Sequence, residues 1–224
     1  MNLLPYQRRF IDFLVHANVL TFGEFTLKSG RKAPYFINTG NFNDGEKICH
    51  LGQLYAAHIV HHALTRANVI FGPAYKGIPL CVSTAIGLFN DHGISAGFTF
   101  DRKEAKDHGD GGILVGNKLE RGDRVIIVED VVTAGTTLNK IVPWVRELAS
   151  LEVLGVVVAV DRCERGTGTM SAVKEIEQNL GVPIFPIVTI HNIVSYLSES
   201  NESGLILSTK VKDSIAAYLK EYSA

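Results

Sequence analysis

The pattern of apolar and polar positions divides the chain into a short front section and a longer alternating section. Residues 1–44 hold one amphipathic helical stripe and then two short apolar runs, at 25–27 and 35–37, with a polar turn at 28–34 between them. Four residues form the stripe at positions i, i+4, i+7 and i+8: Tyr6, Phe10, Phe13 and Leu14. This section therefore predicts a small cap made of one helix and two strands.

From residue 45 to 224, apolar runs rich in Val and Ile alternate with helical segments. We expect strands at 69–71, 96–100, 125–128, 153–160 and 184–188. We expect helices at 46–67, 78–90, 190–197 and 211–222. Another helix should begin near Leu138, and Pro143 should kink or interrupt it. Continuous apolar strands separated by helices are typical of parallel sheets buried on both faces. The predicted fold is one α/β domain over 1–224, with a mostly parallel twisted sheet flanked by helices behind the cap.

Composition narrows the class of protein. The chain has 224 residues, of which 46% are hydrophobic and 20% charged, and its net charge is -1. This balance favours a globular core and argues against a nucleic-acid binder. The three cysteines (Cys49, Cys81 and Cys163) show no metal-ligand spacing. Neither a signal peptide nor an apolar stretch long enough for a membrane is visible, so we expect a cytoplasmic protein without membrane contact.

The segment after the 125–128 strand carries the clearest chemistry. Two adjacent acids, Glu129 and Asp130, precede a run of small and hydroxyl residues at 133–137, and a helix follows. In open α/β sheets, ligands bind beyond the carboxyl ends of the strands, and a helix N-terminus offers unpaired N–H groups to an anion. A helix cap alone explains the threonines but not the two acids. The acids can accept hydrogen bonds from sugar hydroxyls, and the helix N-terminus beside them can bind a phosphate. Together they predict a site for ribose 5-phosphate.

Competing nucleotide motifs do not fit. In the segment 72–77, Lys76 precedes Gly77, which is the reverse of a Walker loop. The short Gly-Thr-Gly at 166–168 lacks the third glycine of a dinucleotide fingerprint.

Segment 129–137 resembles the signature loop of the type I phosphoribosyltransferases. Three further segments, 25–31, 71–77 and 102–109, together with Asp161-Arg162, resemble the orotate phosphoribosyltransferases over nearly the whole chain. The resemblance implies transfer of the 5-phosphoribosyl group of 5-phosphoribosyl 1-diphosphate (PRPP) to orotate, which yields orotidine 5′-monophosphate and pyrophosphate for pyrimidine (UMP) synthesis. It also implies Mg²⁺ and a homodimer in which a mobile lid at 102–112 reaches the neighbouring subunit's site.

The resemblance also implies roles for individual residues. Those expected to act in catalysis are Lys103, Lys106 and Asp130. Those expected to bind PRPP are Lys28, Tyr75, Lys76, Arg102, Lys103, Lys106, His108, Glu129, Asp130, Val131, Val132, Thr133, Ala134, Gly135, Thr136 and Thr137. Those expected to bind orotate are Lys28, Phe36, Ile37, Thr133 and Arg162. No protein ligand is expected for Mg²⁺, because diphosphate, ribose and water oxygens suit it.

Several alternatives stay open at this point. A purine-type phosphoribosyltransferase shares the 129–137 loop, and a PRPP-sensing regulator shares the fold but needs a DNA-binding segment that we do not find. Core packing is the simpler interpretation of Phe36 and Ile37, and family members often carry a second aromatic residue where Ile37 stands. On chemistry alone, Arg165 competes with Arg162 for the orotate carboxylate.

Overall fold

A six-stranded sheet forms the centre of the protein. The computed structural model describes residues 3–27, 30–106, 112–132 and 135–224. The strand order in the sheet is β5-β4-β3-β6-β7-β8, and every neighbouring pair is parallel except β4 with β5. The strands are β3 (Val69–Gly72), β4 (Gly97–Lys106), β5 (Gly112–Gly116), β6 (Arg124–Val132), β7 (Glu152–Asp161) and β8 (Ile184–Thr189).

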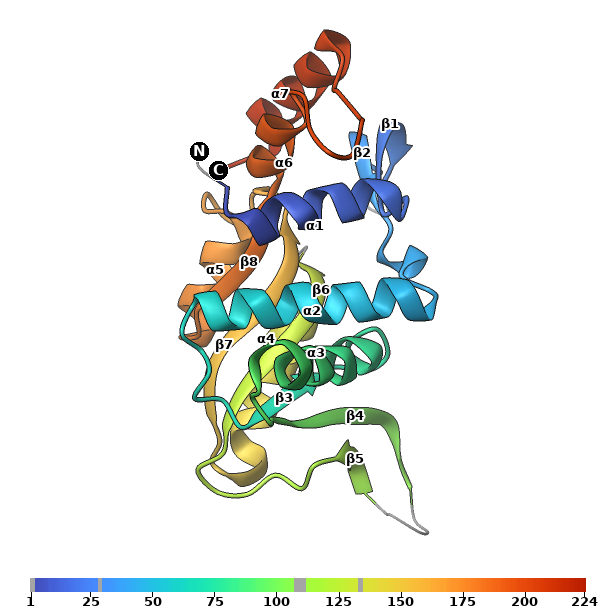
Figure 1. Ribbon diagram of the computed structural model, residues 1–224. Helices are drawn as coiled ribbons and strands as arrows, with labels where there is room; N and C mark the ends of the chain where they lie inside the picture. The colour runs from blue at the N-terminus through green and yellow to red at the C-terminus, as the bar shows by residue number, and fades with distance from the viewer. Residues whose placement is uncertain (1–2, 28–29, 107–111, 133–134) are drawn as a thin grey trace.

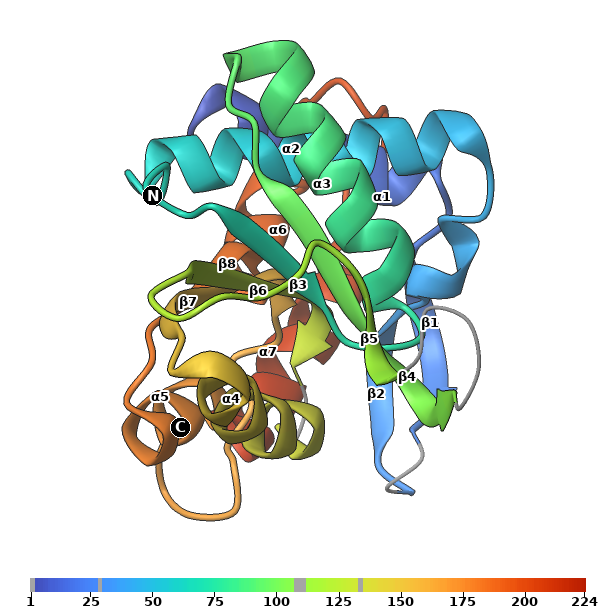
Figure 2. The same cartoon turned by 90° about the horizontal axis from the view of Figure 1, so that it is seen from below.

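Helices cover both faces of this sheet (Figures 1 and 2). They are α1 (Pro5–His16), α2 (Gly45–His61), α3 (Gly77–His92), α4 (Thr136–Ala149), α5 (Ala172–Leu180), α6 (Ile190–Tyr196) and α7 (Thr209–Tyr222). Alternate residues of β6 separate the two cores. Ile126 and Val128 pack with α1, α2 and α3, whereas Val125 and Ile127 pack with α4 and α5. The predicted α/β class, with a mostly parallel sheet, is confirmed.

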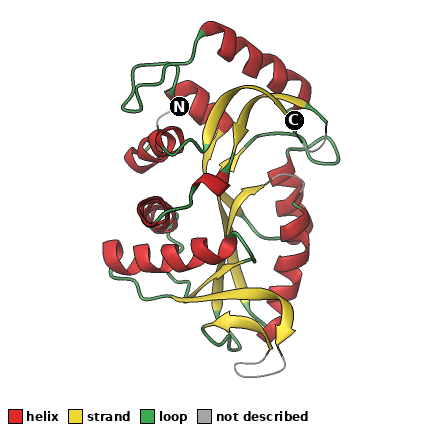
Figure 3. Ribbon diagram, turned by 90° about the vertical axis from the view of Figure 1, so that its right-hand side faces the viewer, coloured by secondary structure: helices red, strands yellow, loops and turns green. Residues whose placement is uncertain are grey.

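The cap is an antiparallel hairpin of β1 (Leu20–Thr26) and β2 (Lys32–Ile37), followed by a short 3₁₀ turn at Thr39–Asn41. The C-terminal helix α7 packs against β2, so the last helix of the chain lies beside the hairpin (Figures 1 and 3). Tyr35 of β2 is fully buried. Residues of the N-terminal section and of the sheet share one hydrophobic cluster.

Several details differ from the sequence-based expectations. Strand β1 begins at Leu20 rather than at residue 25, and β4 runs to Lys106 rather than to residue 100, so it includes the start of the predicted lid. Strand β6 continues past Val128 to Val132, so the two acids belong to the strand and not to a loop. Helix α4 runs unbroken through Pro143, so the expected interruption was wrong; its apolar face, including Val142 and Val145, is fully buried and supports the helix despite one missing hydrogen bond. Strand β5 and helix α5 were not predicted. Helix α2 ends at His61, six residues before the predicted end.

In the described part of the chain, no helix is long and apolar enough to cross a membrane.

Candidate active site

The parallel strands bring separate sequence motifs to one edge of the sheet. Strands β3 and β6 are neighbours, with β4 beyond β3 and β7 beyond β6. Connections therefore leave in opposite directions from the β3/β6 pair, which is the position where open α/β sheets bind ligands. The segment 73–76 follows β3, the two acids lie in the last four residues of β6, and Arg162 follows β7.

The two acids at the end of β6 differ in environment. The Oδ2 of Asp130 accepts hydrogen bonds from Thr39 Oγ1 at 2.5 Å and Lys76 Nζ at 2.9 Å, and its Oδ1 accepts one from the Val131 N–H at 2.7 Å. Burial opposes ionisation of Asp130, but these bonds outweigh it and lower its pKa. Burial, and then the charge of Asp130, raise the pKa of Glu129 to about 7. Below pH 7 the pair therefore carries its negative charge mainly on Asp130.

Two small cavities flank this acid pair. One, of about 240 Å³, is lined by Thr39, Tyr55, Tyr75, Lys76 and Asp130 among others. The other, of about 110 Å³, is lined by residues 129–132 and the start of α4. At that start, Gly135 has a φ of +68°, and a Cβ there would collide with Ile176. The second cavity thus combines a helix N-terminus with a backbone that no side chain obstructs, which suits a phosphate.

The loop after β3 presents a tyrosine and a lysine beside the acids. The side chain of Tyr75 is largely solvent-exposed, and Lys76 reaches Thr39 Oγ1 at 2.8 Å as well as Asp130. The N–H of Ala74 donates to Asp101 Oδ1 at 2.6 Å, which ties this loop to β4. Further along β4, the Nζ of Lys103 lies 5.8 Å from the centre of the Tyr75 ring. The base of the predicted lid therefore adjoins the loop after β3, and Lys76 of that loop contacts the acid pair.

The buried guanidinium of Arg162 lies beyond the end of β7. It stacks on the ring of Tyr35 at 4.7 Å, and its Nε and Nη2 donate to Glu164 Oε1 at 2.8 and 2.6 Å. Arg165, its rival on chemistry, is exposed, and its guanidinium donates to the Glu221 carbonyl. Of the two arginines, Arg162 is the one enclosed by the cap.

Comparison with known proteins decides the family. Residues 38–191 match the phosphoribosyl transferase domain. The orotate phosphoribosyltransferase of Clostridium acetobutylicum is 49% identical over 218 residues, covering 97% of each chain. That of Bifidobacterium longum is 48% identical over 224 residues, covering 96% of this chain and 97% of the relative. The chain belongs to the orotate phosphoribosyltransferase family.

A solved family member has the same overall structure. The crystal structure of the Francisella tularensis orotate phosphoribosyltransferase aligns with a TM-score of 0.83 and 34% identity, covering 96% of this chain and all of that one. The family and the type I fold predicted from the motifs are thus confirmed.

The structure places some predicted site residues and not others. Tyr75, Lys76, Glu129 and Asp130 come together as described above. Phe36 is partly exposed and stacks on Phe25 with ring centres 5.5 Å apart, and Ile37 is half-buried against the core. Several predicted residues lie outside the described residues: Lys28, His108, Thr133 and Ala134. The side chains of Lys106 and Thr136 are likewise outside the description.

Sequence reasoning missed several residues that build the site. Thr39 was not singled out, although it is the hydroxyl partner of Asp130, and Tyr55, which donates to the Glu129 carbonyl at 2.7 Å, looked like a core residue. Glu164 and Tyr218, which contact Arg162, were missed as well. None of them lies in a contiguous motif, so the sequence carried no signal for them.

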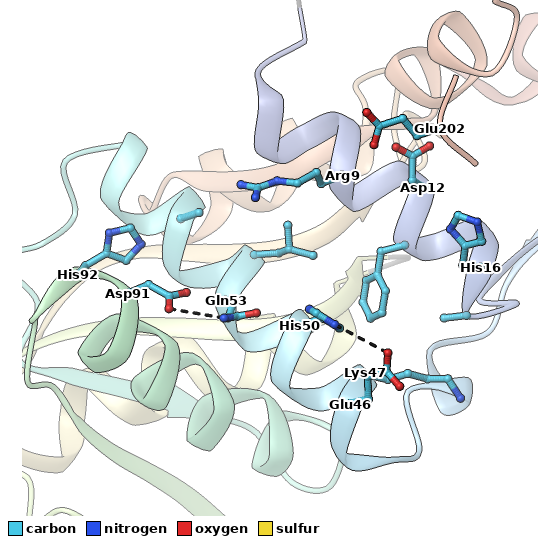
Figure 4. Close-up of a pocket in the computed structure, with 14 residues that line it drawn as sticks. Arg9, Asp12, His16, Glu46, Lys47, His50, Gln53, Asp91, His92 and Glu202 are labelled. Carbon is cyan, nitrogen blue, oxygen red and sulfur yellow. Dashed lines mark hydrogen bonds and ion pairs between the residues drawn. The ribbon is translucent and has the colours of Figure 1, made fainter. Parts of the chain in front are cut away.

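A separate groove lies on the other side of α2 (Figure 4). It has a volume of about 800 Å³ and is lined by charges of both signs, among them Arg9, Lys47, Glu46 and Asp91. Its lining shares no residue with the two cavities beside the acid pair. Figure 4 shows these charged side chains spread over α1, α2 and the end of α3, without convergence on one point.

Proposed function

We propose that this protein transfers the 5-phosphoribosyl group of PRPP to orotate, forming orotidine 5′-monophosphate and pyrophosphate in pyrimidine (UMP) synthesis. The observation that carries the proposal is the Glu129–Asp130 pair beside the open N-terminus of α4, held at the β3/β6 switch point. Ribose 5-phosphate carries a vicinal diol and a phosphate a few ångströms apart. The diol matches the two acids, and the phosphate matches the helix N-terminus.

The PRPP side of the site comprises Thr39, Lys76, Glu129, Asp130 and the start of α4. We expect the ribose hydroxyls to donate to the two carboxylates. We expect the 5′-phosphate to occupy the cavity lined by residues 129–132 and the start of α4, with the Thr137 hydroxyl as a donor. A sugar held at both ends exposes C1′ to the incoming base. Such positioning lowers the barrier without any side-chain nucleophile.

The leaving diphosphate gains negative charge as its bond to C1′ breaks. Lys76 already lies at this site, and Lys103 adjoins Tyr75, so both are placed to stabilise that charge, with Arg102, Lys106 and His108 following on the predicted lid. The Nη1 of Arg102 donates to the Gly112 carbonyl at 3.2 Å, which links the two strands at the base of the lid. Closure over the diphosphate would also exclude water.

Mg²⁺ fits this arrangement as a partner of the substrate. Among the described residues, no group of three or more His, Cys, Asp or Glu side chains is arranged to hold a metal. Diphosphate, ribose and water oxygens would therefore supply its ligands, while Glu129 and Asp130 bind the ribose hydroxyls. When bound, Mg²⁺ would neutralise part of the diphosphate charge.

On the orotate side of the site we expect Lys28, Phe36, Ile37, Thr133 and Arg162 to contact the base. Orotate is a planar anion, so it requires an aromatic or apolar face and a cation for its carboxylate. Phe36 and Ile37 supply the apolar surface, and Arg162 supplies the guanidinium. As the C1′–diphosphate bond breaks, the ring nitrogen of orotate bonds to C1′ and its proton is released.

Exposed apolar residues support the proposed homodimer. Ile86 and Phe89 of α3 are 53% and 61% exposed, and Phe98 of β4 and Ile113 of β5 are also exposed. Monomeric proteins rarely leave apolar groups together in water. Sedimentation equilibrium should give a dimer, and the variant Phe89→Asp should weaken it.

A substrate comparison tests the function directly. With Mg²⁺ and PRPP present, the purified protein should consume orotate and leave hypoxanthine, adenine and uracil unchanged. Consumption of a purine but not of orotate would reject the proposal in favour of a purine-type enzyme.

The cytoplasmic location stays a prediction.

A further inference from the structure

The surroundings of Arg162 involve the C-terminal helix, to which neither the sequence nor the reaction assigns a part. The Oε1 of Glu164 accepts bonds from Arg162 Nε and Nη2, and also from the hydroxyl of Tyr218 on α7 at 2.8 Å. The Tyr218 hydroxyl in turn lies 3.5 Å from Arg162 Nη2. One carboxylate oxygen thus joins the helix to the guanidinium.

The second oxygen of Glu164 extends the link to the cap. Its Oε2 lies 3.1 Å from Arg31 Nη2, and the Arg31 guanidinium lies 5.2 Å from the ring centre of Tyr222 on α7. The backbone adds a further tie, because the Arg165 N–H donates to the Tyr222 carbonyl at 2.8 Å. Glu164 therefore connects the hairpin, the end of β7 and α7.

These contacts determine which nitrogen of the Arg162 guanidinium remains available to bind a ligand. Nε and Nη2 are taken by Glu164, and the ring of Tyr35 covers one face. In the part of the chain that the structure describes, no hydrogen bond engages Nη1. A buried guanidinium without Glu164 would be costly to keep charged, and without Tyr218 its carboxylate partner would lose a hydrogen bond.

We propose that Glu164 and Tyr218 are positioning residues that hold Arg162 with its Nη1 side open to the carboxylate of the pyrimidine, so that α7 forms part of the base-recognition site. The inference rests on the proposed function. It predicts that α7 affects recognition of the carboxylate and leaves recognition of the ribose phosphate unchanged.

Two product nucleotides separate these effects, because orotidine 5′-monophosphate differs from uridine 5′-monophosphate only by the carboxylate. Calorimetric titration of the wild-type protein should show about 10- to 100-fold tighter binding of the orotidine nucleotide. In Tyr218→Phe this preference should fall about fivefold, and in Glu164→Gln about tenfold, with binding of uridine 5′-monophosphate unchanged.

Tyr196→Phe is the matched control. It also removes a tyrosine hydroxyl that donates to a carboxylate at 2.8 Å, but its partner Asp12 lies on α1, away from Arg162. It should keep the wild-type preference. In kinetic assays, Tyr218→Phe should raise KM for orotate and leave KM for PRPP and kcat within about twofold.

The outcomes distinguish the inference from the function. If Tyr218→Phe retains the full preference while the wild type converts orotate, the positioning role is wrong and the function stands. An increased preference in Glu164→Gln would make Glu164 a competitor for the guanidinium, which also overturns the inference. Should Glu164→Gln fail to fold, Tyr218→Phe decides alone. A wild-type protein that neither converts orotate nor distinguishes the two nucleotides would reject the proposed function itself.

Discussion

On the proposed PRPP side of the site, Asp130 is paired with Lys76, whose side chain is 62% exposed, whereas on the proposed orotate side the side chains of Arg162 and Glu164 are 9% and 12% exposed. The first pair is open to solvent on its cationic side, and the second is enclosed by Tyr35 and α7. An open set of charges would suit a flexible, highly charged substrate such as PRPP. An enclosed arginine whose Nε and Nη2 are already held by Glu164 would suit selection of one planar anion, because its geometry is fixed before binding.

The strongest test of this contrast removes the charge of the PRPP side. Asp130→Asn keeps the shape of the side chain but weakens its bonds to Thr39, Lys76 and the ribose. We expect kcat/KM for PRPP to fall about 100-fold or more, since hydrogen bonds to a charged group contribute about 1.5–3 kcal/mol each. Asp123→Asn is a matched control at the opposite edge of the same sheet, where Asp123 accepts from Asn68, and it should retain activity.

Changing the enclosed arginine should affect only the other substrate. Arg162→Lys keeps the charge but loses the planar fork and the contact with Tyr35. Steady-state kinetics should show KM for orotate raised about 30-fold, roughly 2 kcal/mol, and KM for PRPP nearly unchanged. An equal rise in both constants would show that the two sides are not separate.

The lid should contribute to the rate more than to binding. Lys103→Ala removes the cation beside Tyr75, and we expect kcat to fall about tenfold because less charge stabilises the leaving diphosphate. Lys118→Ala, which removes an exposed lysine just after β5, is the control and should behave like the wild type. Unchanged kcat in Lys103→Ala would remove this lysine from the mechanism.

The pH dependence of the unfolding free energy should reveal the raised pKa of Glu129. Glu129 has a pKa of about 7 in the folded protein, above the ordinary value of 4.5, so the folded state binds its proton more tightly than the unfolded state. Its contribution to stability is therefore present below pH 4.5 and is lost as the pH rises to 7. Relative to wild type, Glu129→Gln should gain about 2 kcal/mol in unfolding free energy between pH 4.5 and 8.

Urea denaturation at both pH values measures this gain. Glu147→Gln, at an exposed position of α4, is the control and should follow the wild type at each pH. A gain of equal size in the control, or none in Glu129→Gln, would contradict the raised pKa.

The two sides also differ in how far the sequence could predict them. The PRPP side lies mostly in contiguous segments, 73–76 and 129–137, and buried Val and Ile runs mark the strands that precede them. The surroundings of Arg162 join residues 31, 164 and 218, which the packing of α7 on the hairpin brings together. Even Thr39, which is 91 residues from Asp130 in sequence, became visible only in the fold.

The local pattern of apolar residues did not predict two elements whose formation depends on tertiary contacts. Strand β5 is a five-residue run with a glycine at each end, and pairing with β4 makes it a strand. Helix α5 begins at a Ser171 cap and follows a Gly-rich stretch that reads as a loop.

A crystal structure with orotidine 5′-monophosphate tests the central assignment most directly. The account predicts the ribose hydroxyls within hydrogen-bond distance of Glu129 and Asp130, the phosphate against the backbone of residues 131–137, and the carboxylate at Arg162. A nucleotide bound elsewhere, for example with its phosphate between Arg9 and Lys47, while the pocket beside the acids stays empty, would contradict it.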